Sequence, residues 1–213
     1  MSPTQQWQRH DQIYTKCYCE ENIYMLCRAV ADKAPLELEH YTVVFVSNPD
    51  KKVPFWQQSS CREDGLPVVW DYHVFLLYMA PDENTSYVYD FDTTLPFPCR
   101  ADQYCFQSLR PDFQLPTCFE RYFRLIPAKA YLEHFASDRS HMLGDDGVYH
   151  MPPPNYAAIA TQRHQMNLEA YINMTDNRNS DMFGIVVPEK DLLALVFKQT
   201  TGSDEVEDEG EDK

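Results

Sequence analysis

Glycine is scarce in this chain, with six residues in 213. The glycine-rich GxGxxG pattern, the P-loop and the GxSxG nucleophile elbow are all absent, which argues against nucleotide-binding enzymes and serine hydrolases of those types. Basic side chains are also few, with 18 Lys and Arg against 33 Asp and Glu and a net charge of −15. Because phosphate binding requires clustered Lys and Arg, we expect no nucleic-acid partner.

Long apolar runs are absent as well. The longest, residues 74–80, has the length of a strand rather than of a membrane helix, so we expect no membrane partner. Residues 1–12 are polar and lack the apolar segment of a secretory signal. The seven cysteines form no evident disulfide framework. We therefore expect reduced thiols in a protein of the cytoplasm and nucleus.

The chain does carry enough apolar surface for a packed core, with 44% hydrophobic and 14% aromatic residues. Its length fits one domain. The last eleven residues hold seven acids and one lysine, a composition typical of a solvated terminus. We expect an N-terminal arm at residues 1–13, a single domain at residues 14–201 and a disordered acidic tail at residues 202–213.

Hydrophobic periodicity predicts an α+β protein. The expected helices are residues 19–33, 128–135, 166–174 (capped by Asn167) and 189–198. The expected strands are residues 41–47, 66–79, 86–93, 121–126 and 184–187, with residues 52–56 as a hairpin partner of the first. No regular βαβ repeat occurs and the central strands are hairpin-linked. The predicted fold is therefore a mostly antiparallel central sheet flanked by helices.

Cys19 lies at the expected start of the first helix. Unpaired backbone N–H groups and the helix dipole favour a thiolate there. Glu20 and Glu21 in the first turn oppose this effect, so a nearby imidazolium would be needed. A helical cysteine is more often a small buried hydrophobe, a description that fits Cys27 on the apolar face. Cys17 is the rival nucleophile, and we expect it outside the helix.

His73 interrupts an otherwise apolar strand, and a lone strand histidine is more often structural than catalytic. We expect the hairpin loop of the two central strands to be centred between Pro81 and Asp82. His73 then faces Asp90, whereas a shift of one residue would place Asp92 opposite it. Either carboxylate would fix the imidazole tautomer and stabilise the cation. The chain order Cys, His, Asp is that of papain-like and transglutaminase-like folds, which favours a thiol enzyme.

A structural zinc site is the main chemical alternative for these cysteines. Cys17 and Cys19 are too close together for the usual C-x₂₋₄-C spacing, and no second Cys/His pair follows. Cys99 and Cys105 are too widely spaced. We therefore expect neither a metal nor another cofactor.

Four segments resemble a known family. They are residues 17–23 (CYCEENI), 70–74 (WDYHV), 89–99 (YDFDTTLPFPC) and 135–142 (FASDRSHM). They are similar to the corresponding segments of eukaryotic protein N-terminal glutamine amidohydrolases, and the resemblance runs from about Tyr14 to Val187. It implies a monomeric enzyme with a transglutaminase-like Cys-His-Asp site. Such enzymes convert an N-terminal Gln to Glu and release ammonia, which marks the protein for arginylation and degradation by the N-degron route.

The resemblance also implies the roles of individual residues. It assigns the nucleophile to Cys19, the base to His73 and the orienting acid to Asp90. The backbone N–H of Cys19 is one expected oxyanion donor, and Tyr14 or Gln12 is a candidate for the second.

The α-ammonium of such a substrate needs acceptors, for which Glu21, Asp71 and Asp138 are candidates. We interpret the polar cluster at residues 137–141 as a structural loop closure. Two other functions remain open. One is a cysteine peptidase or transglutaminase with the same triad, and the other is a catalytically silent adaptor that binds partners through its fold and acidic tail.

Overall fold

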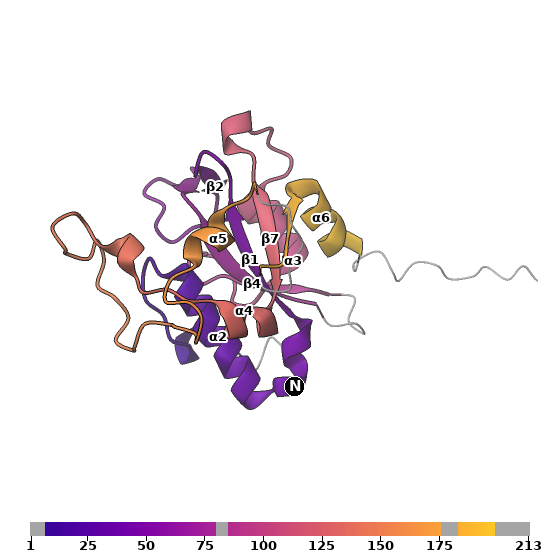
Figure 1. Ribbon diagram of the computed structural model, residues 1–213. Helices are drawn as coiled ribbons and strands as arrows, with labels where there is room; N and C mark the ends of the chain where they lie inside the picture. The colour runs from indigo at the N-terminus through magenta and orange to yellow at the C-terminus, as the bar shows by residue number, and fades with distance from the viewer. Residues whose placement is uncertain (1–6, 80–84, 176–182, 199–213) are drawn as a thin grey trace, which may run out of the picture.

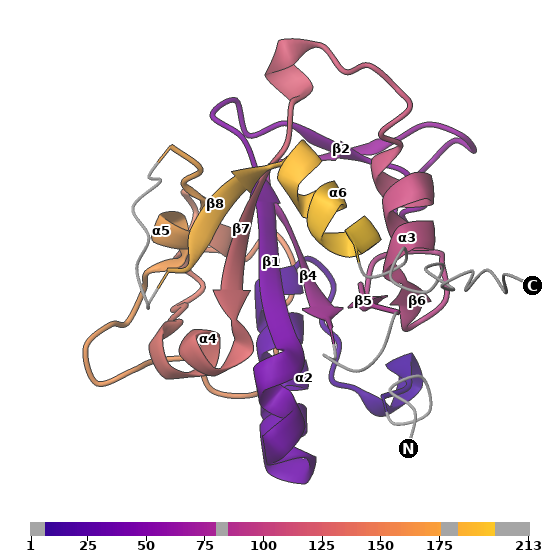
Figure 2. The ribbon, with the colours of Figure 1, turned by 90° about the vertical axis from the view of Figure 1, so that its right-hand side faces the viewer.

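A six-stranded sheet forms the centre of the molecule. The computed structural model describes residues 7–79, 85–175 and 183–198. Within them the strand order is β6-β5-β4-β1-β7-β8, and neighbouring strands are antiparallel (Figure 2). The strands are β1 (Tyr41–Ser47), β4 (His73–Tyr78), β5 (Tyr87–Tyr89), β6 (Cys99–Arg100), β7 (Tyr122–Pro127) and β8 (Ile185–Pro188). The predicted α+β class with an antiparallel sheet is confirmed.

Helices cover both faces of this sheet (Figure 1). One face carries α2 (Cys19–Lys33), α4 (Ala128–His134) and α5 (Leu168–Ile172), and the other carries α3 (Ala101–Tyr104) and α6 (Glu189–Lys198). Short helical turns are η1 (Arg9–Asp11), η2 (Pro35–His40), η3 (Cys105–Leu109), η4 (Thr117–Phe119) and η5 (Ser140–Met142). None of the helices in the described ranges is long and apolar enough to cross a membrane.

The apolar run of β1 supplies both faces of the sheet. Val43 and Phe45 belong to the core beneath α2, whereas Val44 and Val46 belong to the core beneath α6. Successive strand side chains point to opposite faces, so a continuous apolar strand is buried on both sides. The central strands are thereby fixed between two helical layers.

Helix α2 begins and ends where the sequence predicts. Its residues Ile23, Leu26, Cys27 and Val30 recur at helical spacing and are at most 1% exposed. Cys27 is thus the buried hydrophobe that the sequence indicates. Cys17 lies outside the helix, as predicted, with a left-handed φ of 66°.

The single strand predicted at residues 66–79 is wrong. The chain instead forms β3 (Val68–Trp70) and β4, on either side of Asp71 and Tyr72. The Asp71 carboxylate accepts the N–H of Tyr72 at 2.9 Å, and the Asp71 carbonyl accepts the Ser47 hydroxyl at 2.7 Å. These bonds interrupt the strand, and β3 pairs in a separate two-stranded sheet with β2 (Val53–Phe55). The predicted pairing of residues 52–56 with β1 is therefore also wrong.

Helices α4 and α6 and strands β7 and β8 lie close to their predicted positions. The strand predicted at residues 86–93 ends at Tyr89, and the helix predicted at residues 166–174 shortens to α5. Asn167 occupies the N-cap position of α5 without a side-chain capping bond. It instead accepts the N–H of Ala136 at 2.8 Å and donates to the carbonyl of His134 at 2.7 Å, so its side chain joins α5 to the end of α4.

The segment before α2 packs on the domain. Trp7 is 1% exposed, and the Arg9 guanidinium donates to the carbonyls of Asp90 at 3.3 Å and Leu95 at 3.2 Å. The division into arm, domain and tail stays a prediction, and the acidic tail lies outside the described residues.

Candidate active site

Cys19 is held at the start of α2 by its neighbours. The Asn22 side chain accepts the N–H of Thr15 at 2.7 Å and donates to its carbonyl at 2.9 Å, which fixes the chain before the helix. The backbone N–H of Val74 donates to the Cys19 sulfur. Because Val74 directly follows His73, this bond brings the thiol to the first residues of β4.

The pKa of the Cys19 thiol is raised well above its ordinary value. Burial is the largest cause, and the carboxylates of Glu20 and Asp92 add to it, whereas the Val74 N–H lowers the pKa. The opposition expected from the first-turn acids is present at Glu20, and burial adds to it. Both favour the protonated thiol, so attack by the sulfur requires a base.

His73 and Asp90 form a buried pair. Nε2 of His73 lies 3.0 Å from Oδ1 of Asp90, and neither side chain is exposed. Burial alone would lower the pKa of His73, but the Asp90 charge and hydrogen bond outweigh it and raise the pKa. Burial would likewise raise the pKa of Asp90, yet the His73 contact, the Tyr104 hydroxyl at 2.8 Å and the Asp92 N–H at 2.9 Å lower it. The pair therefore stabilises an imidazolium.

Aromatic rings fix the orientation of the His73 imidazole. The Trp70 ring stacks on it, with centroids 5.3 Å apart and planes at 14°, and the Phe55 ring contacts it edge-on at 5.1 Å. Since Nε2 faces Asp90, the second nitrogen, Nδ1, is the one left to take a proton from elsewhere. In the described part of the chain Nδ1 has no hydrogen-bond partner.

The predicted hairpin register, with His73 opposite Asp90, is wrong. Leu76 pairs with Tyr89, a register that would place His73 opposite Asp92 if the ladder continued. The ladder stops at Tyr89, however, and the chain turns so that the Asp90 carboxylate reaches His73. The Asp–His contact thus arises from the end of β5 and not from cross-strand pairing.

Asp92 has a different partner. Its Oδ1 accepts the Tyr14 hydroxyl at 2.7 Å. Burial raises the pKa of Asp92, against the lowering effects of His73 and Tyr14. Tyr14 was a candidate oxyanion donor, but its hydroxyl is engaged here, and the Gln12 amide donates to the Gln8 carbonyl at 3.3 Å. Neither is free to be the second donor in this conformation.

A cavity of about 460 Å³ opens onto Cys19. Its walls come from the α2 start, the β3–β4 junction, the long loop after α4, and α5. The lining residues are Cys17, Cys19, Lys51, Trp70, Asp71, Tyr72, Asp92, His141, Met142, His150, Met166, Leu168, Glu169 and Ile172. His73 and Asp90 lie beneath this surface, so the thiol is the reactive group presented to a ligand.

Glu20 was not predicted as a site residue. It is 0% exposed, its Oε2 accepts the Tyr72 hydroxyl at 3.0 Å, and the same oxygen lies 3.7 Å from the Cys19 sulfur. Its Oε1 lies 3.6 Å from Nε2 of His141. Burial raises the pKa of Glu20 to about 7. The adjacency of Glu20 to Cys19 was visible in the sequence, but its inward orientation was not.

The three predicted acceptors for an α-ammonium differ in their surroundings. Glu21 is buried against the Arg139 guanidinium in two contacts of 2.8 Å, so its charge is already paired. Asp138 accepts the N–H of Ser140 and is not part of the cavity lining. Asp71 is exposed and lines the cavity.

Arg139 closes the loop that follows α4. Besides pairing with Glu21, its guanidinium donates to the carbonyls of Pro154 at 3.2 Å and Tyr156 at 3.0 Å. These bonds join α2 to both branches of the loop that carries His141. The contacts support the structural role expected for residues 137–141.

His73, Asp90 and Asp92 form a possible metal-binding cluster. Among the residues that the structure describes, their ligand atoms all lie within 4.8 Å of one another. The sequence argument from spacing missed this cluster because the three residues meet only in space. Both Asp90 oxygens accept hydrogen bonds, and Oδ1 also faces Nε2 of His73. The absence of a metal requirement stays a prediction.

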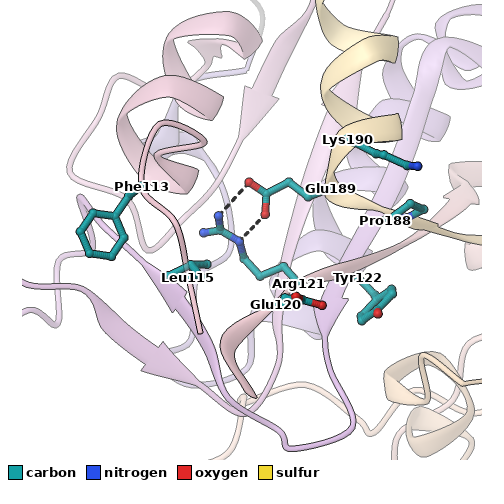
Figure 3. Close-up of a pocket in the computed structure, with 8 residues that line it drawn as sticks. All are labelled: Phe113, Leu115, Glu120, Arg121, Tyr122, Pro188, Glu189 and Lys190. Atoms are coloured by element: carbon teal, nitrogen blue, oxygen red, sulfur yellow. Dashed lines mark hydrogen bonds and ion pairs between the residues drawn. The ribbon is translucent and has the colours of Figure 1, made fainter. Parts of the chain in front are cut away.

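A second cavity, of about 270 Å³, lies between β7 and α6 (Figure 3). Arg121 and Glu189 point toward each other there, with two contacts of 2.8 Å. The Arg121 guanidinium also donates to the carbonyls of Pro54 at 2.9 Å and Leu109 at 2.6 Å. All these charges are paired within the chain, which indicates a structural role.

A thiol at a helix start and a buried His–Asp pair at the start of the strand β4 that this helix contacts are groups that thiol hydrolases use. Comparison with known proteins gives the particular family. Residues 14–196 match the N-terminal glutamine amidase family, and the chain belongs to it.

Several relatives are similar over most of their length. The chain is 46% identical to the protein N-terminal glutamine amidohydrolase of Danio rerio over 162 residues, which cover 76% of this chain and 79% of that one. Identity to the human protein of the same name is 44% over 162 residues, covering 76% and 78%. For the Drosophila willistoni protein it is 43% over 189 residues, covering 89% and 90%.

Proposed function

We propose that this chain hydrolyses the side-chain amide of an N-terminal glutamine to glutamate and ammonia, with Cys19 as the nucleophile. Family membership supports the reaction. The observation that carries the choice of residues is the buried His73–Asp90 pair at the start of β4, next to the Val74 N–H that bonds the Cys19 sulfur.

In the first half-reaction, His73 is the general base. Its Nδ1 takes the thiol proton as the Cys19 sulfur attacks the amide carbon, and Asp90 stabilises the imidazolium that forms. The amide oxygen becomes an oxyanion and accepts the backbone N–H of Cys19, one of the groups that have no intrahelical partner at a helix start. The imidazolium then protonates the amide nitrogen, the C–N bond breaks, and ammonia leaves.

The second half-reaction consumes one water. The γ-glutamyl group is now a thioester on Cys19, and His73 takes a proton from water as the water oxygen attacks the thioester carbon. The C–S bond breaks, the sulfur recovers the proton from His73, and glutamate is released. The protein returns to its resting state, with one amide exchanged for one carboxylate.

The proposal extends to the cellular role. The helix-start thiol and the antiparallel sheet support our assignment of a papain/transglutaminase-like fold. We place the reaction in a monomeric enzyme of the cytoplasm and nucleus, whose product would be arginylated and degraded by the N-degron route.

Mass spectrometry of a Gln-initiated peptide tests the activity. After incubation, the peptide should gain about one mass unit while an equal amount of ammonia appears. A shortened peptide would instead indicate a cysteine peptidase, and coupling to an added amine would indicate a transglutaminase. An unchanged peptide, together with ordinary cysteine reactivity, would indicate a silent adaptor.

A further inference from the structure

We propose that the buried carboxylate of Glu20 accepts the α-ammonium of the substrate, and that this pairing makes the neighbouring Cys19 thiol easier to ionise. The inference rests on the proposed function, since it names the group that recognises the chain terminus. A single ion pair, between the substrate α-ammonium and Glu20, would then both recognise the chain terminus and lower the pKa of the nucleophile.

Glu20 is a buried carboxylate without a matching cation. It is 0% exposed, and within the described residues its Oε1 has no hydrogen-bond partner. Oε2 accepts hydrogen bonds from the Tyr72 hydroxyl at 3.0 Å and from the Cys19 thiol, whose sulfur is 3.7 Å away, and neither donor is a cation. Burying an unpaired carboxylate is costly, and burial accordingly raises the pKa of Glu20 to about 7. A ligand cation would remove this cost.

The other buried acids near Cys19 are already engaged. Arg139 neutralises Glu21, His73 pairs with Asp90, and the Tyr14 hydroxyl bonds Asp92. Asp71 is the remaining rival, but its side chain is exposed, and an ion pair in water contributes little. Glu20 is therefore the acceptor with the most to gain from an ammonium.

The distance between the Cys19 sulfur and the Glu20 carboxylate fits the length of a glutamine residue. Its α-nitrogen and side-chain amide carbon are separated by three carbons, a distance of about 4–5 Å. The amide carbon must come within about 3–3.5 Å of the sulfur for attack. Glu20 Oε2 lies 3.7 Å from that sulfur, and Oε1 is on the other branch of the carboxylate. One substrate residue can therefore contact both groups.

His141 stands where the ammonium would bind. It lines the cavity, its Nε2 is 3.6 Å from Glu20 Oε1, and in the described part of the chain neither ring nitrogen has a hydrogen-bond partner. Burial lowers the pKa of His141, so the ring is neutral near pH 7 and is a weak partner for the carboxylate. Its side chain is 21% exposed, and in this proposal the substrate ammonium takes the place of the ring beside Glu20 Oε1.

The same charge acts on the thiol. The Glu20 carboxylate is the second-largest cause, after burial, of the raised pKa of Cys19. Among the described residues, the titratable groups near Glu20 or Cys19 are Glu21, Asp71, Tyr72, Asp92, Tyr131 and His141, together with His73 as the proposed base. Of these, the two histidines could become cationic; His73 is already paired with Asp90, and burial lowers the pKa of His141. An ammonium on Glu20 offsets the repulsion, so a substrate with a free terminus favours its own attack. An acetylated terminus gives no such compensation.

Glu20→Gln tests the inference through two effects of opposite sign. Without substrate, the pKa of Cys19, taken from the pH dependence of alkylation, should fall by about one unit, giving about tenfold faster labelling near neutral pH. With a Gln-initiated peptide, kcat/KM should fall about 100-fold, mainly through KM. Glu37→Gln is the matched control, because Glu37 also bonds a tyrosine hydroxyl, that of Tyr78 at 3.4 Å, outside the cavity. It should change neither quantity.

A substrate change completes the test. Replacing the substrate α-ammonium by a hydroxyl should cost the wild type about 100-fold and the Glu20→Gln variant less than about threefold. If Glu20→Gln is unfolded by circular dichroism, Glu20→Asp replaces it and should show an intermediate loss with slow alkylation retained.

Several results would overturn the assignment of Glu20. The first is an equal loss of kcat/KM, in the wild type and in Glu20→Gln, when the substrate α-ammonium is replaced by a hydroxyl. The second is an alkylation rate of Cys19 that Glu20→Gln leaves unchanged. The third is that Asp71→Asn, and not Glu20→Gln, removes the preference for a free substrate terminus. Failure of the wild type to release ammonia from any Gln peptide would sink the proposed function itself, and the alkylation measurement would still report the effect of Glu20 on the thiol.

Discussion

Nε2 of His73 lies 3.0 Å from Oδ1 of Asp90, and both side chains are fully buried. The contact fixes which imidazole nitrogen faces the carboxylate, and in the proposed mechanism the other nitrogen, Nδ1, takes the thiol proton. Trp70 and Phe55 restrict the ring further. A base held in one orientation suits the proposed mechanism, in which the thiol proton must leave as the sulfur attacks.

Asp90→Asn should lower kcat by about 10³–10⁴-fold, because the asparagine amide no longer stabilises the imidazolium and can select the wrong tautomer. Steady-state ammonia release, with circular dichroism to verify folding, measures the effect. Asp92→Asn is the comparison, since Asp92 is bonded to Tyr14 rather than to His73. A greater loss in Asp92→Asn would mean that the wrong carboxylate has been assigned.

Cys19→Ser should lose about 10⁴-fold or more in rate, because an alcohol is ionised far less readily than a thiol by the same base. Cys118→Ser, at an exposed position, is the control and should retain the wild-type rate. Comparable ammonia release from Cys19→Ser and the wild type would remove Cys19 from the mechanism.

Glu20 should make stability depend on pH. Burial raises its pKa from the ordinary 4.5 to about 7, so the folded chain holds this proton more tightly than the unfolded chain does. This proton's contribution to the free energy of unfolding is fully present below about pH 4.5 and is lost as the pH rises through about 7. Relative to Glu20→Gln, the wild type should lose on the order of 2–3 kcal/mol of unfolding free energy between pH 5 and pH 8, measured by urea titration. Parallel curves for the two proteins would show that Glu20 titrates normally.

Arg139→Met should destabilise the fold by about 3–5 kcal/mol, because it leaves the Glu21 carboxylate buried without a partner. The double variant Arg139→Met, Glu21→Gln should recover part of this loss. The exposed pair Lys51–Glu169 is the control, and Lys51→Met should cost less than about 1 kcal/mol. Urea unfolding measures the stability of all three variants. Equal losses of unfolding free energy for Arg139→Met and Lys51→Met would contradict a stabilising role for the buried Arg139–Glu21 ion pair.

Activity should survive prolonged chelation. The His73, Asp90 and Asp92 cluster is compact enough for an ion, but the proposed mechanism uses His73 and Asp90 for proton transfer and needs no metal. Ammonia release after dialysis against a chelator is the measurement. Loss of activity that zinc restores would make this cluster a metal site.

Local periodicity was sufficient for α2, α4 and α6, whereas α3 was not predicted and α5 is shorter than predicted. Helix α2 was predicted to the residue because Ile23, Leu26 and Val30 recur at a spacing that only a helix can bury together. The strands were predicted less well. The break at Asp71 depends on a bond from the Ser47 hydroxyl, which is distant in sequence and invisible to a local pattern.

The site likewise combines features that the local sequence predicts with features that depend on tertiary contacts. The sequence indicated an Asp–His contact, but the β4–β5 register was wrong, because the chain leaves the ladder at Tyr89. Glu20 was visible only as an acid in the first helical turn, a position that is ordinarily exposed. Its burial follows from tertiary contacts with Tyr72 and His141, which no local signal predicts.

The most direct test of the thiol mechanism is alkylation of the wild-type chain with the label mapped by mass spectrometry. Loss of ammonia-releasing activity should follow labelling of Cys19 one-for-one, and a Gln-initiated peptide should slow both. Full activity in molecules labelled at Cys19, or inactivation that follows another cysteine, would contradict Cys19 as the nucleophile.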